Sequence, residues 1–323
     1  MALGGISRFL AGRLLQAALV LAVMSFVVYG LIGLMPGDPI DAMIVADPEL
    51  TSEDTERLKA LYGLDRPLQE RYFAWAGRAL SGDFGHSRIY HRPVLDLLAE
   101  RLPHTVLLMG LAFAFTVVIA LPAGVFAALK ANRLADYVIS FLCFAGISTP
   151  PFWLAIMAML LFSVTLGWLP ATGYPTAGDA DWPERLRHLI LPVAVLGLLS
   201  TGGITRYVRA AMREALRQDY VRTARAKGLS RAVVMRRHVL RNALIPVVTI
   251  LALDMGALFS GALITEIMFG YPGMGALIYS AVMENDYNLA LVGLLFATFT
   301  TLAANIAADG AYIALDPRIA FRT

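Results

Sequence analysis

Long runs of apolar residues, separated by short charged segments, dominate this chain. Residues 14–37 and 102–129 contain no charged side chain, and the uncharged run 137–178 is long enough for one crossing and a following loop. A helix needs about 20 mostly apolar residues to cross the hydrocarbon core of a bilayer. The pattern predicts six transmembrane helices, at about 14–37, 104–129, 137–166, 188–205, 244–268 and 287–313.

Within the third of these helices, the pair Pro150-Pro151 predicts a kink, because proline interrupts the backbone hydrogen bonds of a helix. Its far end is predicted near Gly167, and a loop then continues to Arg187. The fold class is therefore an all-α integral membrane protein. Residues 104–313 are predicted to form its transmembrane domain, and a short tail follows at 314–323.

Positive charge is concentrated between the fourth and fifth predicted helices. Residues 206–241 carry eleven Arg or Lys side chains against two acids, whereas 269–286 carries Glu284 and Asp286 and no Arg or Lys. Short cytoplasmic loops are enriched in Lys and Arg. The basic segment is therefore predicted to be cytoplasmic, and six crossings then place both termini in the cytoplasm as well.

The first apolar run has an alternative explanation as a cleaved signal peptide, because Arg8 and Arg13 precede it. It is longer than the ~7–15-residue apolar region of such a peptide, and it ends at Met35-Pro36-Gly37-Asp38 without a small-residue cleavage site. We therefore predict that residues 1–35 form a cytoplasmic N-terminus and a retained first helix.

Composition narrows the class of protein further. Of the 323 residues, 58% are hydrophobic and 16% are charged, against about 25% charged in an average soluble domain. The single cysteine, Cys143, excludes a disulfide framework and a four-cysteine zinc site. The chain lacks the Gly-Lys pair of a phosphate-binding P-loop, and its histidines do not form an HExxH metal motif. We expect no metal site and no nucleotide site in this chain.

Residues 36–103 are predicted to form a small helical segment on the extracytoplasmic side. Thr51 or Ser52 is a suitable first residue for one helix, which ends at Gly63. A second helix begins at Pro67 and ends before Gly82. A third is predicted from Pro93, with the side chains Val94, Leu97 and Leu98 on one side, and is expected to lie at the membrane interface before the second crossing.

The basic cytoplasmic segment 206–243 has the pattern of a helix, a break and a second helix. The first helix covers Tyr220 to Lys227, Gly228 terminates it, and Ser230 is the N-cap of the next one. Two interpretations are equally compatible with these residues, namely contact with anionic lipid and docking of a partner protein. A nucleic-acid-binding helix-turn-helix is disfavoured, because both flanking helices lie in the membrane.

Residues 217–230 (RQDYVRTARAKGLS) and 241–246 (RNALIP) resemble the cytoplasmic "EAA" loop of permease subunits in ABC-type importers, in the variant of the dipeptide, oligopeptide and nickel permease family. Further landmarks of that family follow in the expected order. They are Pro36-Gly37-Asp38-Pro39, the segment 61–68 (LYGLDRPL), Gly82-Asp83-Phe84-Gly85, Arg101-Leu102-Pro103, Gly167-Trp168-Leu169-Pro170 and Gly270-Tyr271-Pro272-Gly273-Met274-Gly275.

Two departures from the general EAA pattern narrow the resemblance. Arg222 stands at the position of the glutamate, and Thr223 replaces the first alanine. The spacing from Gly228 to Pro246 is also longer than in sugar-type permeases. Both features look like the peptide-type branch.

The resemblance implies a complex in the bacterial inner membrane. Its other members would be a homologous second permease, two ATPase subunits that bind ATP and Mg²⁺, and an extracytoplasmic substrate-binding protein. No cofactor is implied for this chain, and no nucleic acid. The short helix of the loop would dock in a cleft of an ATPase subunit, and the residues implied in this coupling are Asp219, Tyr220, Arg222, Thr223, Ala224, Arg225, Ala226, Lys227, Gly228, Leu229 and Ser230.

Polar residues inside the fifth and sixth helices are candidates for a transport pathway. They form one stripe on each helix, because positions spaced by 3, 7 and 11 residues share a helix face. The candidates are Asp254, Gly261, Thr265, Thr298, Thr301 and Asn305. Close helix packing is the alternative role for such small and polar residues. Glu266 lies about 120° from its stripe and is expected to contact the outer loop or the binding protein.

These observations and the resemblance predict that this chain is a permease subunit of an ATP-driven importer for di- or oligopeptides or a related small solute. The alternative is a self-sufficient secondary transporter that uses Asp254 and Glu266 for ion coupling. An intramembrane enzyme is disfavoured, because the sequence offers neither a nucleophile with its base nor a metal cluster.

Overall fold

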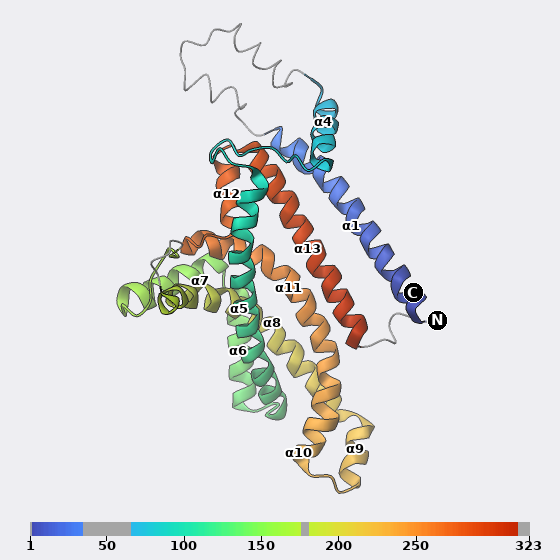
Figure 1. Cartoon of the computed structure of the whole chain (residues 1–323). Coiled ribbons are helices and arrows are strands. Elements are labelled where there is room, and N and C mark those ends of the chain that lie inside the picture. Colours follow the sequence, from blue (N-terminus) through green and yellow to red (C-terminus); the bar gives the residue numbers. More distant parts are fainter. Residues whose placement is uncertain (1, 35–65, 176–180, 316–323) are drawn as a thin grey trace.

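A computed structural model describes residues 2–34, 66–175 and 181–315, and every regular element in these ranges is helical (Figure 1). The α-helices are α1 (Ala2–Ile32), α4 (Leu68–Leu80), α5 (Val94–Leu129), α6 (Leu134–Ser148), α7 (Pro151–Ala158), α8 (Trp182–Arg217), α9 (Asp219–Ala226), α10 (Arg231–Val233), α11 (Arg241–Phe269), α12 (Met274–Met283) and α13 (Tyr287–Leu315). Two π-helical segments, η1 (Met159–Thr165) and η2 (Val234–Leu240), continue α7 and α10.

Four described helices are individually long and apolar enough to cross a membrane, namely α1, α5, α8 and α13. Two bent pairs of helices bring the number to as many as six if each pair counts as one span. The all-helical membrane fold is thus confirmed, whereas the exact count of six crossings stays a prediction.

The first bent pair consists of α6 and the continuous segment α7–η1. The chain turns by 106° between Ser148 and Pro151, which confirms the predicted break at Pro150-Pro151. A proline at the first position of a helix is favourable, because its missing N–H would have no partner there. The run 137–166 therefore consists of two helices at about a right angle, and its assignment as one kinked crossing stays a prediction.

The helix that contains the fourth predicted crossing, α8, is much longer than the apolar run from which that crossing is predicted. α8 begins at Trp182 and ends at Arg217, so the expected loop up to Arg187 and the expected loop from residue 206 are both partly helical. Its polar ends contain good helix formers, such as Glu184 and the Arg-rich stretch 206–217. A hydrophobicity criterion detects the membrane-embedded part of a helix and misses such extensions.

The segment between the first two crossings agrees only in part with prediction. α4 follows Pro67 as expected, whereas the helix predicted at 51–63 lies outside the described residues. The helix predicted from Pro93 is not a separate interfacial element, because α5 runs without interruption from Val94 through Pro103 to Leu129. Its first turns are buried by other helices, and this burial keeps them in line with the span.

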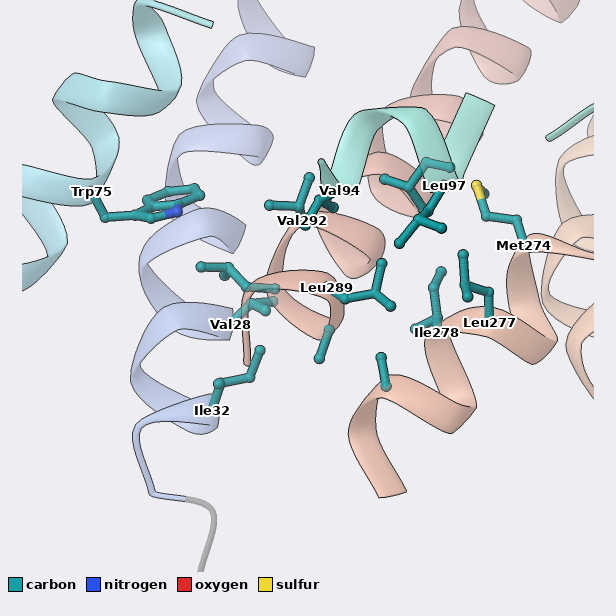
Figure 2. Close-up of a cluster of buried hydrophobic side chains, with 14 residues drawn as sticks. Val28, Ile32, Trp75, Val94, Leu97, Met274, Leu277, Ile278, Leu289 and Val292 are labelled. Atoms are coloured by element: carbon teal, nitrogen blue, oxygen red, sulfur yellow. The ribbon is translucent and has the colours of Figure 1, made fainter. Parts of the chain in front are cut away.

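A core cluster near that end of α5 joins five helices (Figure 2). Val28 of α1, Trp75 of α4, Leu97 of α5, Ile278 of α12 and Leu289 of α13 are among its buried members. The sequence pattern predicts no helix in the segment 269–286, in which the structure has α12. α12 folds back into the bundle at 77° to the last part of α11 and buries its apolar side there.

The centre of the bundle is the contact between α5 and α8, which small residues allow to be close. A Cβ atom at Gly124 of α5 would lie 2.6 Å from the Val208 side chain of α8. In turn, a Cβ at Gly197 of α8 would lie 3.0 Å from the carbonyl oxygen of Ala112. Thr116 Oγ1 donates a hydrogen bond to the Gly197 carbonyl oxygen at 2.9 Å. Small residues and interhelical hydrogen bonds of this kind stabilise helix pairs in membranes.

Candidate functional site

The predicted coupling segment is the short helix α9 followed by a tight turn, at the end of the bundle opposite α12 (Figure 1). Gly228 adopts a left-handed conformation, with φ of +79°. Its N–H donates to the Arg225 carbonyl oxygen at 2.9 Å, and the Leu229 N–H donates to that of Ala224 at 3.3 Å. This pair of bonds is the Schellman arrangement, which ends a helix at a glycine. The predicted roles of Gly228 as helix terminator and of Ser230 as the next N-cap position are confirmed.

One face of α9 is fixed to its own bundle. Val221 and Ala224 are 1% and 5% exposed, and they belong to a cluster with Met212 of α8 and with Val234 and Val239 of η2. Ala224 therefore has its close packing partners within this chain. α9 therefore contacts α8 directly and is linked to α11 through η2, which continues into that helix.

The opposite face of α9 and its turn is exposed. Thr223 Oγ1 donates to the Asp219 carbonyl oxygen, and the Asp219–Arg222 ion pair at 3.4 Å is almost fully solvent-exposed, so it contributes little to stability. The exposed residues of the predicted coupling set are Asp219, Tyr220, Arg222, Thr223, Arg225, Ala226, Lys227, Gly228, Leu229 and Ser230. Three of these carry a positive charge, so a cationic surface faces away from the bundle.

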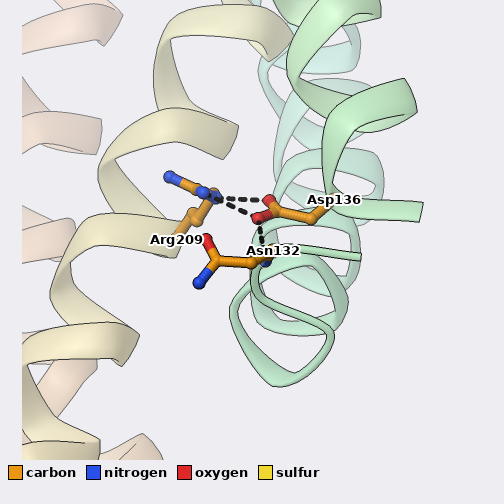
Figure 3. A network of polar contacts seen from close by, with 3 residues as sticks. All are labelled: Asn132, Asp136 and Arg209. Carbon is orange, nitrogen blue, oxygen red and sulfur yellow. Dashed lines mark hydrogen bonds and ion pairs between the residues drawn. The ribbon is translucent and has the colours of Figure 1, made fainter. Parts of the chain in front are cut away.

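An ion pair fixes the extended part of α8 to α6 (Figure 3). Arg209 Nε and Nη2 donate to the two carboxylate oxygens of Asp136 at 2.5 and 2.7 Å, and the Asn132 N–H donates to the same carboxylate at 2.9 Å. The Asp136 side chain is 1% exposed. Bidentate Arg–carboxylate pairs are strong and directional. The sequence does not predict that Asp136 and Arg209 form a pair. The only indication of it is that Asp136 is an acid in the first turn of a helix, within a region rich in positive charge.

At the other end of the bundle, Glu266 is fully buried where α11 turns towards α12. Its carboxylate accepts hydrogen bonds from Thr105 Oγ1 of α5 at 2.6 Å and from the Ala276 N–H at 3.0 Å. Thr105 Oγ1 in turn accepts the Met274 N–H at 2.8 Å. A carboxylate is favourable at the N-terminus of a helix, where N–H groups lack partners within the helix. Glu266 thus caps α12 and ties it to α5.

Glycines in the turn between α11 and α12 make room for this carboxylate. A Cβ atom at Gly273 would lie 2.0 Å from Glu266 Cδ, and one at Gly275 would lie 2.8 Å from Oε2. Gly270 ends α11 in a left-handed conformation, with φ of +57°. The turn Gly270–Gly275 is therefore shaped around Glu266. Glu266 thus contacts the turn that follows α11, and its predicted contact with the outer loop or the binding protein stays a prediction.

A neighbouring network connects the loop before α5 to the turn between α12 and α13. Ser87 Oγ donates to Asp286 Oδ2 at 2.5 Å, and the Leu289 N–H donates to Asp286 Oδ1 at 3.2 Å. Asn288 Nδ2 donates to the His86 carbonyl oxygen at 3.1 Å. Asp286 therefore caps α13 and also holds the preceding loop. No sequence pattern predicts this network, because its partners Ser87 and Asp286 are 199 positions apart in the chain.

The structure brings part of the predicted pathway set together. Thr298 and Thr301 of α13 line a cavity of about 420 Å³, together with Thr105 and Glu266. Both threonine hydroxyls donate to carbonyl oxygens one turn earlier in α13, so the cavity is lined at these positions by side chains whose donors are satisfied.

The other predicted pathway residues are not among the described residues that line this cavity. Asp254 is half-buried in α11, and its Oδ2 atom is buried without a hydrogen-bond partner among the described residues. Thr265 is 1% exposed, Gly261 lies within α11, and Asn305 is half-buried in α13. At the far end of α13, Asp309 forms a 2.9 Å ion pair with Arg13 of α1.

Two family profiles match the sequence of this chain. The profile described as the inner membrane component of binding-protein-dependent transport systems matches residues 120–321, and that of the N-terminal part of the same component matches residues 6–109. The chain belongs to this family. The permease is an ABC importer subunit in a system with ATPase and binding-protein components, which decides against the secondary-transporter alternative.

Several relatives of the permease extend over almost its whole length. A putative peptide permease protein of Brucella ovis is 41% identical over 97% of this chain and 98% of its own length. The oligopeptide transport system permease protein AppB of Bacillus subtilis is 36% identical over 93% and 94% of the two chains. The di/tripeptide transport system permease protein DppB of Pseudomonas aeruginosa is 37% identical over 92% and 94%.

Solved structures share the fold of the permease at lower sequence similarity. The MetNI methionine ABC transporter, in inward-facing conformations, aligns with a TM-score of 0.54 at 18% identity over 68% of this chain and 96% of that one. This similarity shows that the permease shares the helix arrangement of that transporter over the aligned part.

Proposed function

We propose that this permease imports short peptides, and that α9 docks into a cleft of a separate ATPase subunit. The geometry of α9 carries the docking proposal, because one face is held by α8 and η2 while a cationic face is exposed at one end of the bundle (Figure 1). The names of the relatives, which are peptide, oligopeptide and di/tripeptide permeases, support a peptide as the solute.

The end of the bundle that carries α9 is proposed to be cytoplasmic, together with both termini. The eleven Arg and Lys residues of the segment 206–241 support this orientation. The end with α4 and α12 then faces the substrate-binding protein. The proposed complex contains one homologous permease and two ATPase subunits, which bind ATP and Mg²⁺. This chain supplies half of the pathway and carries out no hydrolysis itself.

The contacts of α9 provide a route for mechanical coupling. Closure of the ATPase pair around ATP would move the docked helix as a rigid body. Val221 and Ala224 would pass this movement to α8 and to η2, which continues into α11. The ion pair between Arg209 and Asp136 joins α6 to the same unit. A displacement at α9 would therefore reach three membrane helices.

The pathway is proposed to follow the polar residues of α11 and α13. The cavity lined by Thr298 and Thr301 supports this part of the proposal. Asp254, Gly261, Thr265 and Asn305 complete the proposed set, and close packing between helices is their alternative role.

The test combines peptide uptake with recovery of the ATPase subunits. Gly228→Glu should abolish uptake and ATPase co-purification while the chain remains inserted, because the left-handed turn disfavours any side chain and the added charge faces the docking surface. Arg225→Glu leaves that turn intact and should also reduce both quantities at least fivefold. Lys130→Glu reverses an exposed charge outside α9 and is the matched control.

Normal uptake with Gly228→Glu and Arg225→Glu would refute the docking role of α9. Failure of the wild-type complex, supplied with its binding protein, to import any di- or tripeptide would refute the peptide assignment.

A further inference from the structure

A second cavity, of about 390 Å³, lies beside the turn between α11 and α12. Arg101 of α5 lines it, together with the hydroxyl-bearing side chains of Tyr90, Tyr279 and Ser280. Tyr90 and Tyr279 are 40% and 44% exposed, so this cavity is accessible from outside the described chain. Its volume lies within the range of about 300–1,000 Å³ that is typical of small-molecule sites.

Arg101 supplies the only positive charge in the lining of this cavity as the structure describes it. Its Nε atom is buried and has no hydrogen-bond partner there, and no ion pair of Arg101 occurs among the described residues. The adjacent acid, Glu100, pairs with Arg92 at 3.1 Å instead. A buried N–H group without a partner is costly, which favours a ligand that accepts its hydrogen.

The acid in the same lining, Glu266, does not satisfy Arg101. Its oxygens accept from Thr105 and from the first turn of α12. The charge of Glu266 is thus directed towards the N-terminus of a helix, whereas the guanidinium of Arg101 remains available. A guanidinium binds carboxylates through two parallel hydrogen bonds. Tyrosine and serine hydroxyls on the cavity wall can donate to the same oxygens.

Glu266 also lines the cavity that contains Thr298 and Thr301. Glu266 is thus common to the described linings of both cavities, so a solute beside Arg101 would lie near the proposed pathway.

We infer that the cavity beside Arg101 binds the terminal carboxylate of the transported peptide before the peptide enters the pathway. This inference rests on the proposed function, since it takes a peptide as the solute. Arg101 would form the ion pair, and the hydroxyls of Tyr279 and Ser280 would orient the carboxylate.

A thiol-protection experiment on the whole complex in lipid nanodiscs tests this assignment without the binding protein. The buried Cys143 is replaced by serine, and Tyr90→Cys then places the only thiol of this chain in the cavity wall, at a residue to which the inference gives no contact with the carboxylate. The rate of its reaction with a membrane-impermeant maleimide is measured with L-alanyl-L-alanine, with the amide of the same dipeptide, and with inorganic phosphate. The free dipeptide at tens of millimolar should slow labelling at least threefold, and the amide and phosphate should not.

Arg101→Gln should remove the protection, and Arg101→Lys should retain part of it. Arg92→Gln removes another positive charge at the same end of the helix bundle, and it should leave the protection by the dipeptide unchanged. Equal protection by dipeptide and amide, protection by phosphate, or protection that persists in Arg101→Gln would overturn the inference. So would a thiol that is unreactive without any ligand, because the cavity would then be filled by a partner subunit.

Uptake of the same dipeptide by the wild-type complex with its binding protein distinguishes failure of the carboxylate site from failure of the proposed function. Normal uptake without protection overturns only the carboxylate site, whereas the absence of uptake for any peptide overturns the proposed function.

Discussion

Replacement of Gly273 by alanine should disrupt the cap that Glu266 forms on α12. The added Cβ atom would lie 2.0 Å from Glu266 Cδ, whereas two carbon atoms in contact are about 3.5–4.0 Å apart. The carboxylate must therefore move by roughly 1.5 Å. A movement of this size lengthens the 2.6 Å bond from Thr105 beyond hydrogen-bonding distance.

The end of a flexible side chain can often move away at little cost, but Glu266 is fully buried and bound on two sides. Loss of two hydrogen bonds to a buried carboxylate costs about 3–5 kcal/mol. For a chain of 323 residues, that corresponds to a decrease in the unfolding temperature of roughly 4–7 °C.

A second substitution tests whether Glu266 is the cause. In a Glu266→Ala background, the atoms that approach position 273 most closely are absent, so Gly273→Ala should change the unfolding temperature by less than about 1 °C. The measurement is the fraction of intact, nanodisc-embedded complex after heating, under one fixed protocol because unfolding of such assemblies is often irreversible. Gly203→Ala is the control, since a Cβ atom there meets nothing within 4 Å.

Wild-type stability of Gly273→Ala would refute the reasoning. So would an equal loss of stability in the presence and absence of the Glu266 side chain, since the strain would then lie in the backbone.

Two further predictions use the same heating assay. Gly202→Ala should unfold roughly 2–4 °C below Gly203→Ala. Both variants gain the same helix propensity, but only a Cβ atom at position 202 would lie 2.6 Å from a carbonyl oxygen of α6. Equal unfolding temperatures would mean that α6 and α8 are not in close contact there. Asp136→Asn should destabilise the protein by about 2–4 kcal/mol, since it leaves Arg209 without its carboxylate, and Arg209→Gln in the same chain should recover part of this loss. A double variant that loses the sum of the two single effects would contradict the pairing.

The coupling segment could be predicted closely from the sequence because its structure is local. The bonds that end α9 join residues three to five positions apart, and Gly228 is suited to the left-handed turn that these bonds require. The break at Pro150-Pro151 is local for the same reason, since each proline constrains its own turn of helix. The apolar runs likewise indicated where helices lie in the membrane, although not where they end.

Tertiary structure alone decided the roles of the buried polar residues. Thr105 and Glu266 are 161 positions apart, and Ser87 and Asp286 are 199 apart, so no periodic pattern in either segment indicates that they meet. The same applies to α12, whose sequence is compatible with a loop or with a buried helix until the neighbouring helices provide a surface for it. A helical membrane protein with a short basic helix that ends at Gly228 could be predicted from sequence, because those properties depend on composition and on near neighbours. The cavities and the capped turn around Glu266 depend on how the helices pack against one another, because they are formed by side chains from several elements at once.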